Sequence, residues 1–522
     1  MVAALASGML RLFALILLIP FASAAQTLTV TPDFTALAEQ AAEASMDEFR
    51  EVLAIANDAH FPDQVEANVA WTEAAFGRRG FNTQRLETGG PPLVLAELAK
   101  GDGGGVTVLV YLQMDGQPVD SSFWRQPSPY DAVLKEEVTA EGWVEKPWSA
   151  LNVGWSSDPV ARDYRVFARS ASDAKGPVAQ FLAAIDALRQ NGASPAYNLK
   201  VILDFEEELG SPHLPAAVKR YSDALAADHL VILDGPMHPS NRPTLAFGAR
   251  GISTVTLETF GPRRPQHSGH YGNYAPNPAW DLIKLLAPLK DEAGRVQLEG
   301  WYDGIEIGAE ARAALEGVPD DEEKIRRKMG VARMDSVGNT LQEAIQYPSL
   351  NIRGIGSGWI REERRTIIPS TALVELDIRL VIESDPERLL SLLRKYIEEA
   401  GYFVVEGRSP TATERLQHPR VLRWDSEISY QAFRTDIDSP TGRWLTAALT
   451  NVYGSTPVRI RTHGGSIPIS PFVNTLGVPA VIVPLVNADN NQHSPNENIR
   501  LGNYVDGIAT VMGVLTTGIG GE

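Results

Sequence analysis

Cysteine is absent from this chain of 522 residues. Its absence excludes disulfide bonds, thiolate ligands for zinc, a cysteine nucleophile and a lipid-modified lipoprotein cysteine. Any metal ion that the protein binds must therefore be held by His, Asp and Glu side chains.

Basic residues are in the minority. The sequence has 47 Lys and Arg against 65 Asp and Glu, which gives a formal net charge of −18 at pH 7. Charge of this sign repels phosphate backbones, so we expect no binding to nucleic acid.

Long apolar runs are missing beyond the N-terminus. Residues 1–24 contain Arg11, an apolar run over residues 12–20 and small side chains at 22–24. This order of features is typical of a cleaved secretory signal peptide. No later stretch approaches about 18 uninterrupted apolar residues, the length that a membrane-spanning helix needs. We therefore expect a secreted or periplasmic protein that is soluble, with no membrane attachment after cleavage.

Apolar runs typical of buried strands alternate with helical patterns along much of the chain. One helix is predicted to begin near Pro177 and to end before Gly192. Residues 121–159, which are rich in Trp, Pro and Ser, are expected to form a long irregular loop. Strands that alternate with helices predict a doubly wound α/β sheet, which binds ligands at the carboxyl ends of its strands. The strands are expected at residues 92–98, 106–112, 199–203, 229–233 and 480–485.

The pattern changes in the middle of the chain. Residues 372–381 alternate apolar and polar side chains, and residues 384–386 begin a helix that ends at Gly401. This pattern predicts a small α+β domain that is inserted into the α/β domain, since the α/β pattern resumes afterwards. The expected boundaries are 1–24 for the signal peptide, 25–242 and 416–522 for the two parts of the α/β domain, and 243–415 for the inserted domain.

Acidic side chains follow several of the predicted strands. The apolar run at residues 199–203 leads into Asp204 and then Glu206, Glu207 and Glu208. Neighbouring side chains on extended backbone point to opposite sides, so adjacent acids can have separate tasks. Several acids at strand ends are costly unless a cation neutralises them. Along the whole chain, the candidate site residues are Gln113, Asp115, Asp173, Glu207, Glu208, Asp234 and His493.

These residues occur within motifs whose order and spacing are familiar. The chain resembles the metallopeptidase family that contains carnosine dipeptidases, aminoacylase, carboxypeptidase G and succinyl-diaminopimelate desuccinylase, and it is most similar to the dipeptidase branch. The resemblance implies a zinc-peptidase-like catalytic domain with an inserted lid and dimerisation domain. The segments that carry it are 111–118, 169–177, 207–211, Asp234, 267–269, 347–354, 379–381, 464–468 and 493–497.

The resemblance implies a centre with two divalent metal ions. Asp173 would bridge the ions, Glu208 and His493 would complete one site, and Asp234 would belong to the other. We expect zinc, with manganese or cobalt as alternatives.

The resemblance also implies roles in catalysis and substrate binding. Glu207 would be the general base, and Asp115 would orient a ligand. His267 would reach the active site of the other subunit of a homodimer and stabilise the oxyanion there. The residues implied in substrate binding are Arg379, which would clamp the substrate carboxylate, and His463, Gly465 and Ser466.

One position departs seriously from the family pattern. The family's first motif is His-x-Asp, whereas this chain has Gln113 followed by Met114 and Asp115. An amide oxygen is a neutral and weaker donor to a transition metal than imidazole. The departure allows three outcomes, namely a weakened dinuclear centre, a single metal ion, or a protein that no longer catalyses.

A second departure bears on the first. The dipeptidase branch has Glu where this chain has His463, directly before the two glycines 464 and 465. We hypothesise that His463 or His270 partly replaces the missing imidazole.

Two classes of function fit these observations. The first is an exported metal-dependent hydrolase that cleaves an amide bond next to a free carboxylate, either as a dipeptidase or exopeptidase, which the motifs favour, or as a deacylase of N-acyl amino acids. The second is a catalytically silent protein that binds a peptide or a metal ion. Gln113 supports the second class, whereas Glu207 opposes it because a binding protein has little need for an unpaired acid beside its ligands.

Overall fold

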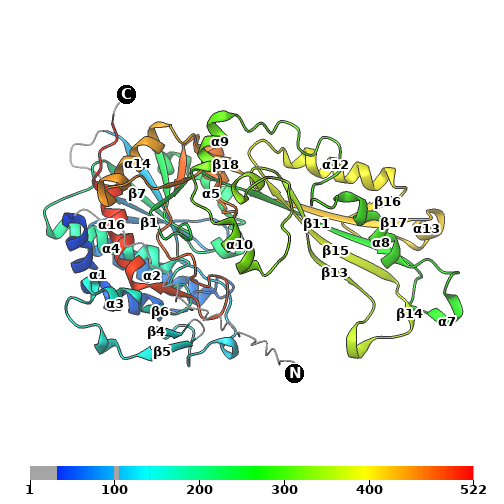
Figure 1. Ribbon diagram of the computed structural model, residues 1–522, viewed down its shortest axis with the longest axis horizontal. Coiled ribbons are helices and arrows are strands. Elements are labelled where there is room, and N and C mark those ends of the chain that lie inside the picture. Colours follow the sequence, from blue (N-terminus) through cyan, green and yellow to red (C-terminus); the bar gives the residue numbers. More distant parts are fainter. Residues whose placement is uncertain (1–31, 99–104, 140–141, 521–522) are drawn as a thin grey trace, which may run out of the picture.

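The computed structural model describes residues 32–98, 105–139 and 142–520, which form a large and a small domain side by side (Figure 1). The expected signal peptide, residues 1–24, lies outside the described residues. Within the described ranges, none of the helices has the length and apolar character needed to cross a membrane.

The large domain is built on an eight-stranded sheet in the order β1-β2-β7-β3-β8-β20-β9-β19. The four central strands β7, β3, β8 and β20 are parallel to one another. Both faces of such a sheet are covered, which explains why residues 108–112 form a continuous buried apolar run. The strands are β1 (Asn82–Leu86), β2 (Leu93–Leu98), β3 (Thr107–Gln113), β7 (Asn198–Asp204), β8 (His229–Ile232), β9 (Thr244–Ala246), β19 (Val458–Ile460) and β20 (Ala480–Ile482).

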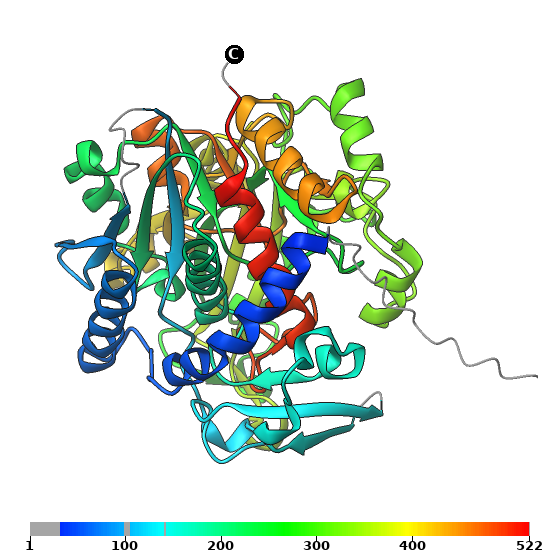
Figure 2. The same cartoon turned by 90° about the vertical axis from the view of Figure 1, so that its left-hand side faces the viewer.

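Helices cover the two faces of this sheet. On one face, Val108, Val110 and Leu112 pack in a core with α1, α2, α4, α14 and α16, several of which cross the front of Figure 2. On the other face, Leu109 and Tyr111 pack with α5, α6 and α15. The helices are α1 (Pro32–Leu53), α2 (Pro62–Arg78), α4 (Lys175–Gln190), α5 (Leu214–Arg220), α6 (Ser222–Leu225), α14 (Pro440–Tyr453), α15 (Ser470–Leu476) and α16 (Leu501–Thr516).

A four-stranded sheet, in the order β21-β6-β4-β5, extends the large domain. The expectation of an irregular loop over residues 121–159 is wrong for its centre, which forms the hairpin of β4 and β5. Strand β4 also pairs with β6, which in turn pairs with β21 near the other end of the chain, so local composition does not reveal this sheet. The elements here are η1 (Ser121–Phe123), β4 (Val133–Thr139), β5 (Gly142–Lys146), η2 (Trp148–Ala150), η3 (Trp155–Ser157), α3 (Pro159–Asp163), β6 (Arg165–Phe167) and β21 (Asn498–Arg500).

The small domain has a five-stranded sheet in the order β13-β15-β11-β17-β16, with α8 and α12 packed on it. As the alternation predicted, Val374, Leu376 and Ile378 face the core, whereas Glu375 and Arg379 do not. The predicted fold class, a doubly wound α/β domain with an inserted α+β domain, is confirmed. The elements are β11 (Gly251–Phe260), α8 (Pro278–Leu286), β13 (Ser349–Ser357), β15 (Thr371–Leu380), α12 (Pro386–Glu399), β16 (Phe403–Glu406), α13 (Ala412–Gln417) and β17 (Val421–Tyr430).

The observed strand pairing differs from the predicted limits of the inserted domain, residues 243–415. Strand β9 lies within those limits but belongs to the large sheet, and β17 lies after them but pairs with β11 of the small sheet. The small domain therefore begins near Gly251 and ends near Tyr430. The partner of β17 lies far away in the sequence, so its domain could not be read from its own residues.

Shorter elements complete the chain. At the outer end of the small domain, β12 (Gln266–His267), α7 (Ser268–Tyr271) and β14 (Ile367–Ile368) lie far from the large sheet (Figure 1). The other short elements are η4 (Glu207–Leu209), β10 (Gly248–Ala249), η5 (Ala287–Leu289), α9 (Ala309–Glu316), α10 (Glu322–Met329), α11 (Leu341–Ala344), η6 (Arg361–Glu363) and β18 (Phe433–Arg434).

Candidate active site

The carboxyl ends of three neighbouring parallel strands bring the predicted polar residues together. Gln113 is the last residue of β3, Glu207 and Glu208 lie on η4 directly after β7, and Asp234 follows β8. Two loops from elsewhere in the chain reach the same edge. The loop before α4 contributes Asp173, and the loop before β21 contributes His493, Asn496 and Glu497.

Asp173, Glu208 and His493 form the one group among the described residues whose ligand atoms could hold a metal ion, since these atoms all lie within 4.8 Å of one another. Nε2 of His493 is 3.0 Å from Oδ2 of Asp173 and 3.3 Å from Oε2 of Glu208. Two carboxylate oxygens and one imidazole nitrogen are a donor set that suits zinc and leaves room for a water or substrate ligand. The donor set therefore fits one divalent ion.

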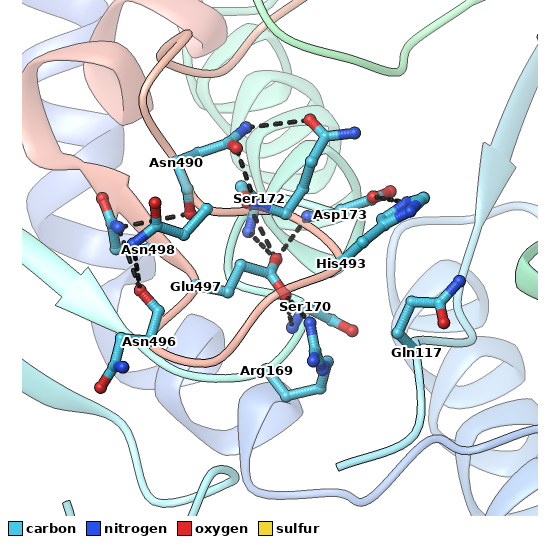
Figure 3. A network of polar contacts seen from close by, with 12 residues as sticks. Gln117, Arg169, Ser170, Ser172, Asp173, Asn490, His493, Asn496, Glu497 and Asn498 are labelled. Atoms are coloured by element: carbon cyan, nitrogen blue, oxygen red, sulfur yellow. Dashed lines mark hydrogen bonds and ion pairs between the residues drawn. The ribbon is translucent and has the colours of Figure 1, made fainter. Parts of the chain in front are cut away.

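A buried glutamate, Glu497, fastens the two ligand-bearing loops to each other (Figure 3). Its Oε1 accepts hydrogen bonds from the backbone N–H of Ser172 at 3.0 Å, the hydroxyl of Ser172 at 2.8 Å and the backbone N–H of Asp173 at 2.8 Å. Its Oε2 accepts from Nη1 of Arg169 at 2.6 Å and from the backbone N–H of Ser170 at 3.0 Å. Glu497 belongs to the motif at residues 493–497, but its role was not evident from the sequence.

Asp115 lies beneath the turn that carries Glu207 and Glu208. Its Oδ2 accepts the backbone N–H of Glu208 at 2.9 Å, while its buried Oδ1 has no hydrogen-bond partner among the described residues. Burial, and then the charges of Asp204 and Glu208, raise the pKa of Asp115 well above its ordinary value. Asp115 is thus placed to orient the turn.

Glu207 makes no ion pair within the described part of the chain, and it is surrounded by other carboxylates. Burial raises its pKa, and the negative charges of Glu208, Asp234 and Asp173 raise it further. A carboxyl group with a raised pKa can exchange a proton near neutral pH, as a general acid or base must.

Asp173 has different partners on its two oxygens. While Oδ2 faces His493, Oδ1 accepts a hydrogen bond of 2.9 Å from Nε2 of Gln113. Asp234 is near enough that the charge of Asp173 raises its pKa, after the larger effect of burial. A second glutamine, Gln117, which the sequence analysis did not single out, donates from Nε2 to Oε2 of Glu208 at 2.8 Å.

The predicted substrate-binding residues gather where the small sheet meets the large domain. Nη1 of Arg379 donates to Oγ of Ser466 at 2.7 Å, and Asp377 lies 3.6 Å from Nε of Arg379. In the adjoining loop, the backbone N–H of Gly465 donates to Nδ1 of His463 at 3.2 Å. Burial lowers the pKa of His463.

Tyr430, at the end of β17, was not identified as a site residue from the sequence. It links this region to the acidic turn, the turn that carries Glu207 and Glu208. Ile252 of β11 pairs with Tyr430 on one side and with Arg379 on the other, so the three side chains form one row across the sheet. A Cβ atom placed on Gly210 would lie 3.7 Å from Cε1 of Tyr430. The pKa of Tyr430 is raised by burial and then by the charge of Glu207. The row therefore extends from the acidic turn to Arg379.

Two predicted histidines lie elsewhere. His267 and His270 are exposed, with ring centroids 4.7 Å apart, at the outer end of the small domain (Figure 1). The hypothesis that His270 replaces the missing imidazole is wrong within one chain, because α7 places His270 at the outer end of the small domain, far from the large sheet. The family resemblance implies this separation for His267, whose expected role is in the other subunit, but not for His270. The same hypothesis for His463, which lies in the loop beside Ser466, stays a prediction.

Metal binding at this site is expected to release a proton. His493 must be neutral to offer Nε2 to a metal ion, but the hydrogen bond with Asp173, and then the charge of Glu208, raise its pKa above the ordinary value. Below the raised pKa the proton competes with the metal ion. The affinity for zinc should therefore increase by about tenfold per pH unit through neutral pH.

Isothermal titration calorimetry with zinc, in buffers of different ionisation enthalpy, measures both the affinity and the proton release. An affinity that is independent of pH between about pH 6 and pH 8 would show that His493 does not bind the ion.

Comparisons with known proteins agree with this architecture. The sequence profile described as Peptidase family M20/M25/M40 matches residues 128–517. Human Beta-Ala-His dipeptidase is 27% identical over 424 residues, which are 80% of this chain and 75% of that protein. The Cys-Gly metallodipeptidase of Schizosaccharomyces pombe is 26% identical over 414 residues, which are 76% of this chain and 83% of that protein.

A solved structure shows the same fold. The M20 family metallo-carboxypeptidase of Sulfolobus solfataricus superposes with a TM-score of 0.73 at 25% sequence identity, and the match covers 90% of this chain and 98% of that one.

Proposed function

The chain belongs to Peptidase family M20/M25/M40, and on that premise we propose that it is a metal-dependent dipeptidase which cleaves a peptide bond next to a free carboxylate. The observation that carries the proposal is the grouping of Asp173, Glu208 and His493 beside Glu207. Arg379 on β15 of the small domain and Ser466 in the loop after β19 of the large domain are hydrogen-bonded where the two domains meet, and they supply the means to recognise a substrate carboxylate.

The proposed metal ligands are Asp173, Glu208 and His493, and zinc is the ion that this donor set favours, with manganese or cobalt as alternatives. Such an ion, when bound, acts as a Lewis acid and lowers the pKa of water. Glu497 and Asp115 hold the ligand-bearing segments in position through hydrogen bonds to backbone N–H groups.

Glu207 is the proposed general base. It accepts a proton from the attacking water and later donates that proton to the leaving amine, so its carboxyl returns to its starting state. Arg379 holds the substrate carboxylate, because a guanidinium can donate two parallel hydrogen bonds to it. Ser466 contacts Arg379 at the carboxylate end, and Tyr430 lies in the same row of the sheet as Arg379.

We further propose that the enzyme is a homodimer in which His267 serves the site of the other subunit. Two observations support this. First, His267 lies at the outer end of its own small domain. Second, β13 is an edge strand, and its Ile352 and Ile355 side chains have relative exposures of 48% and 57%. Exposed apolar edge strands pair readily with another chain. Sedimentation under assay conditions tests the proposal, since an active monomer excludes any role of His267 in trans.

Export of the protein is also proposed, on the basis of the N-terminal sequence alone. N-terminal sequencing of the protein recovered from outside the cytoplasm tests it, because cleavage near Ala24 is expected.

An assay of amine release tests the proposed reaction. The purified protein is supplied with zinc, manganese or cobalt and incubated with a panel of dipeptides and N-acyl amino acids. Turnover of dipeptides supports the proposal, whereas turnover of N-acyl amino acids alone identifies a deacylase. Folded protein that is silent on the whole panel with every metal is instead a binding protein, the function that Gln113 favours.

Replacing Arg379 with Ala is expected to raise KM for dipeptides by about 10- to 100-fold, since hydrogen bonds to a charged group are worth about 1.5–3 kcal/mol. Dipeptide amides, which lack the carboxylate, should show little change. The comparison of KM values for the two substrate types measures the effect. Arg379→Lys, which keeps the charge but not the fork, should recover only part of the loss.

Arg394→Ala is the matched control for Arg379→Ala. Arg394 lies on the exposed side of α12 and pairs with Glu398 at 2.7 Å. In Arg394→Ala, KM for dipeptides should be unchanged. An equal rise in KM for dipeptides and their amides in Arg379→Ala would contradict the proposed clamp.

A further inference from the structure

We propose that this chain holds one divalent ion, at Asp173, Glu208 and His493, and that the side-chain amide of Gln113 takes the place of a second ion. The inference rests on the proposed metal-dependent function and departs from the dinuclear centre that the family resemblance implies. It is carried by hydrogen bonding at Asp173, by the chemistry of the remaining donors and by the grouping of the ligand atoms.

The two oxygens of Asp173 are already committed to different partners. Oδ2 lies 3.0 Å from Nε2 of His493 and belongs to the metal-binding group. Oδ1 accepts the amide N–H of Gln113 at 2.9 Å, an ordinary length for such a hydrogen bond. A carboxylate that bridges two cations needs one free oxygen for each. Gln113 therefore occupies the oxygen that a second ion would require.

Rotation of the Gln113 amide would offer a second ion only a neutral amide oxygen beside Oδ1 of Asp173, a weaker donor than imidazole. In the arrangement of the structure, the N–H of Gln113 faces Asp173, and its buried Oε1 has no hydrogen-bond partner among the described residues. Both side chains are buried, with relative exposures of 1% for Gln113 and 5% for Asp173, so no solvent relieves a mismatch between them.

The donors that remain for a second ion are poor. With Oδ1 of Asp173 engaged, the donors that the family resemblance assigns to that side are Asp234 and the neutral amide oxygen of Gln113. Neutral amide oxygen binds zinc and similar ions more weakly than imidazole. Asp234 is also absent from the group of ligand atoms that the described residues form around Asp173.

An adjacent amide also engages Glu208, because Nε2 of Gln117 donates at 2.8 Å to Oε2, the oxygen that faces His493. Glu208 binds one ion and keeps its other oxygen for it, whereas a bridging Asp173 needs both of its oxygens. Gln117 therefore provides a matched control for Gln113, because each is a glutamine that donates to one metal-binding carboxylate.

Metal content tests the inference without reference to activity. The full-length mature protein is stripped with a chelator, loaded with zinc, dialysed and analysed by inductively coupled plasma mass spectrometry, and calorimetric titration with zinc gives the number of sites independently. The wild type should bind one zinc per chain. Gln113→His, which supplies an imidazole and removes the N–H to Oδ1, should bind two. Gln117→His should still bind one.

The single variant Asp234→Asn should keep one zinc per chain, a test that does not require Gln113→His to fold. If Gln113→His folds, adding Asp234→Asn should return its content from two zinc ions to one. Two zinc ions in the wild type, or a single ion in folded Gln113→His, would overturn the inference. Folded wild-type protein that retains no zinc would instead overturn the proposed metal-dependent function itself, and the inference with it.

Discussion

Replacing Glu207 with Gln should lower kcat by about 10²- to 10⁴-fold, the usual contribution of a general acid or base. Gln has nearly the same size and hydrogen-bonding reach, but its amide cannot accept the proton of the attacking water. Burial and four neighbouring carboxylates raise the pKa of Glu207 above its ordinary value, which favours proton uptake by its carboxyl group. Removing its charge also reduces repulsion within the site, so metal affinity should not fall.

The measurement is kcat for the preferred dipeptide, together with the metal content of the same preparation. Glu206→Gln is the matched control. Glu206 is the preceding residue, but its carboxylate faces the other way and contacts Nδ1 of His213 at 2.9 Å. Glu206→Gln should keep kcat within about threefold of the wild-type value, because Glu206 is neither a proposed metal ligand nor a proposed catalytic residue. If Glu207→Gln kept most of its kcat with the metal bound, another group would have to be the base.

Replacing Glu497 with Ala should destabilise the fold by about 3–5 kcal/mol, the cost of removing one partner of a buried ion pair. Glu497 and Arg169 have side-chain exposures of 0% and 3% and lie 2.6 Å apart. The substitution leaves the guanidinium buried without its carboxylate and also frees the N–H groups of Ser170, Ser172 and Asp173. Since these groups position a metal ligand, metal affinity should fall by about 10- to 100-fold.

Urea unfolding followed by circular dichroism measures the stability, and zinc titration of the folded variant measures the affinity. Asp489→Asn is the control in the same loop. Asp489 pairs with Arg165 at 2.6 Å, and its side chain is 57% exposed. The buried Arg165 keeps its hydrogen bonds to the backbone oxygen of Asp489 and to Oδ1 of Asn498, so the loss should be at most about 1 kcal/mol. Equal losses of unfolding free energy in the two variants would show that the ion pair of Glu497 with Arg169 stabilises the fold no more than an exposed ion pair does. Unchanged zinc affinity in Glu497→Ala would contradict its positioning role.

Patterns confined to neighbouring residues were predicted well. The apolar run that becomes β7, with acids directly after it, placed Glu207 and Glu208 at the carboxyl end of a buried strand. The alternation along β15 predicted which side chains face the core, although Asp377 on that strand is buried as well. Both succeeded because a strand's side-chain period of two is a local property.

Features that depend on distant partners were not predictable in this way. The hairpin of β4 and β5 is stabilised by pairing with β6, and through it with β21, which follows more than 300 residues after β4 in the printed sequence. The row that joins Tyr430 to Arg379 exists because β11 pairs with both β17 and β15. The residues of one strand do not determine which distant strand pairs with it or in which register.

The sequence by itself determined the family, the α/β architecture with its inserted domain, and the residue types available for a metal site in a chain without cysteine, because composition, periodicity and motif order are properties of the linear chain. The tertiary structure alone decided how those residues are used. It turned one oxygen of Asp173 to His493 and the other to Gln113, buried Glu497 against Arg169, and separated His267 from the site of its own chain. These outcomes depend on the directions and distances of side chains that come from different loops, which are fixed only when the packed sheets hold those loops together.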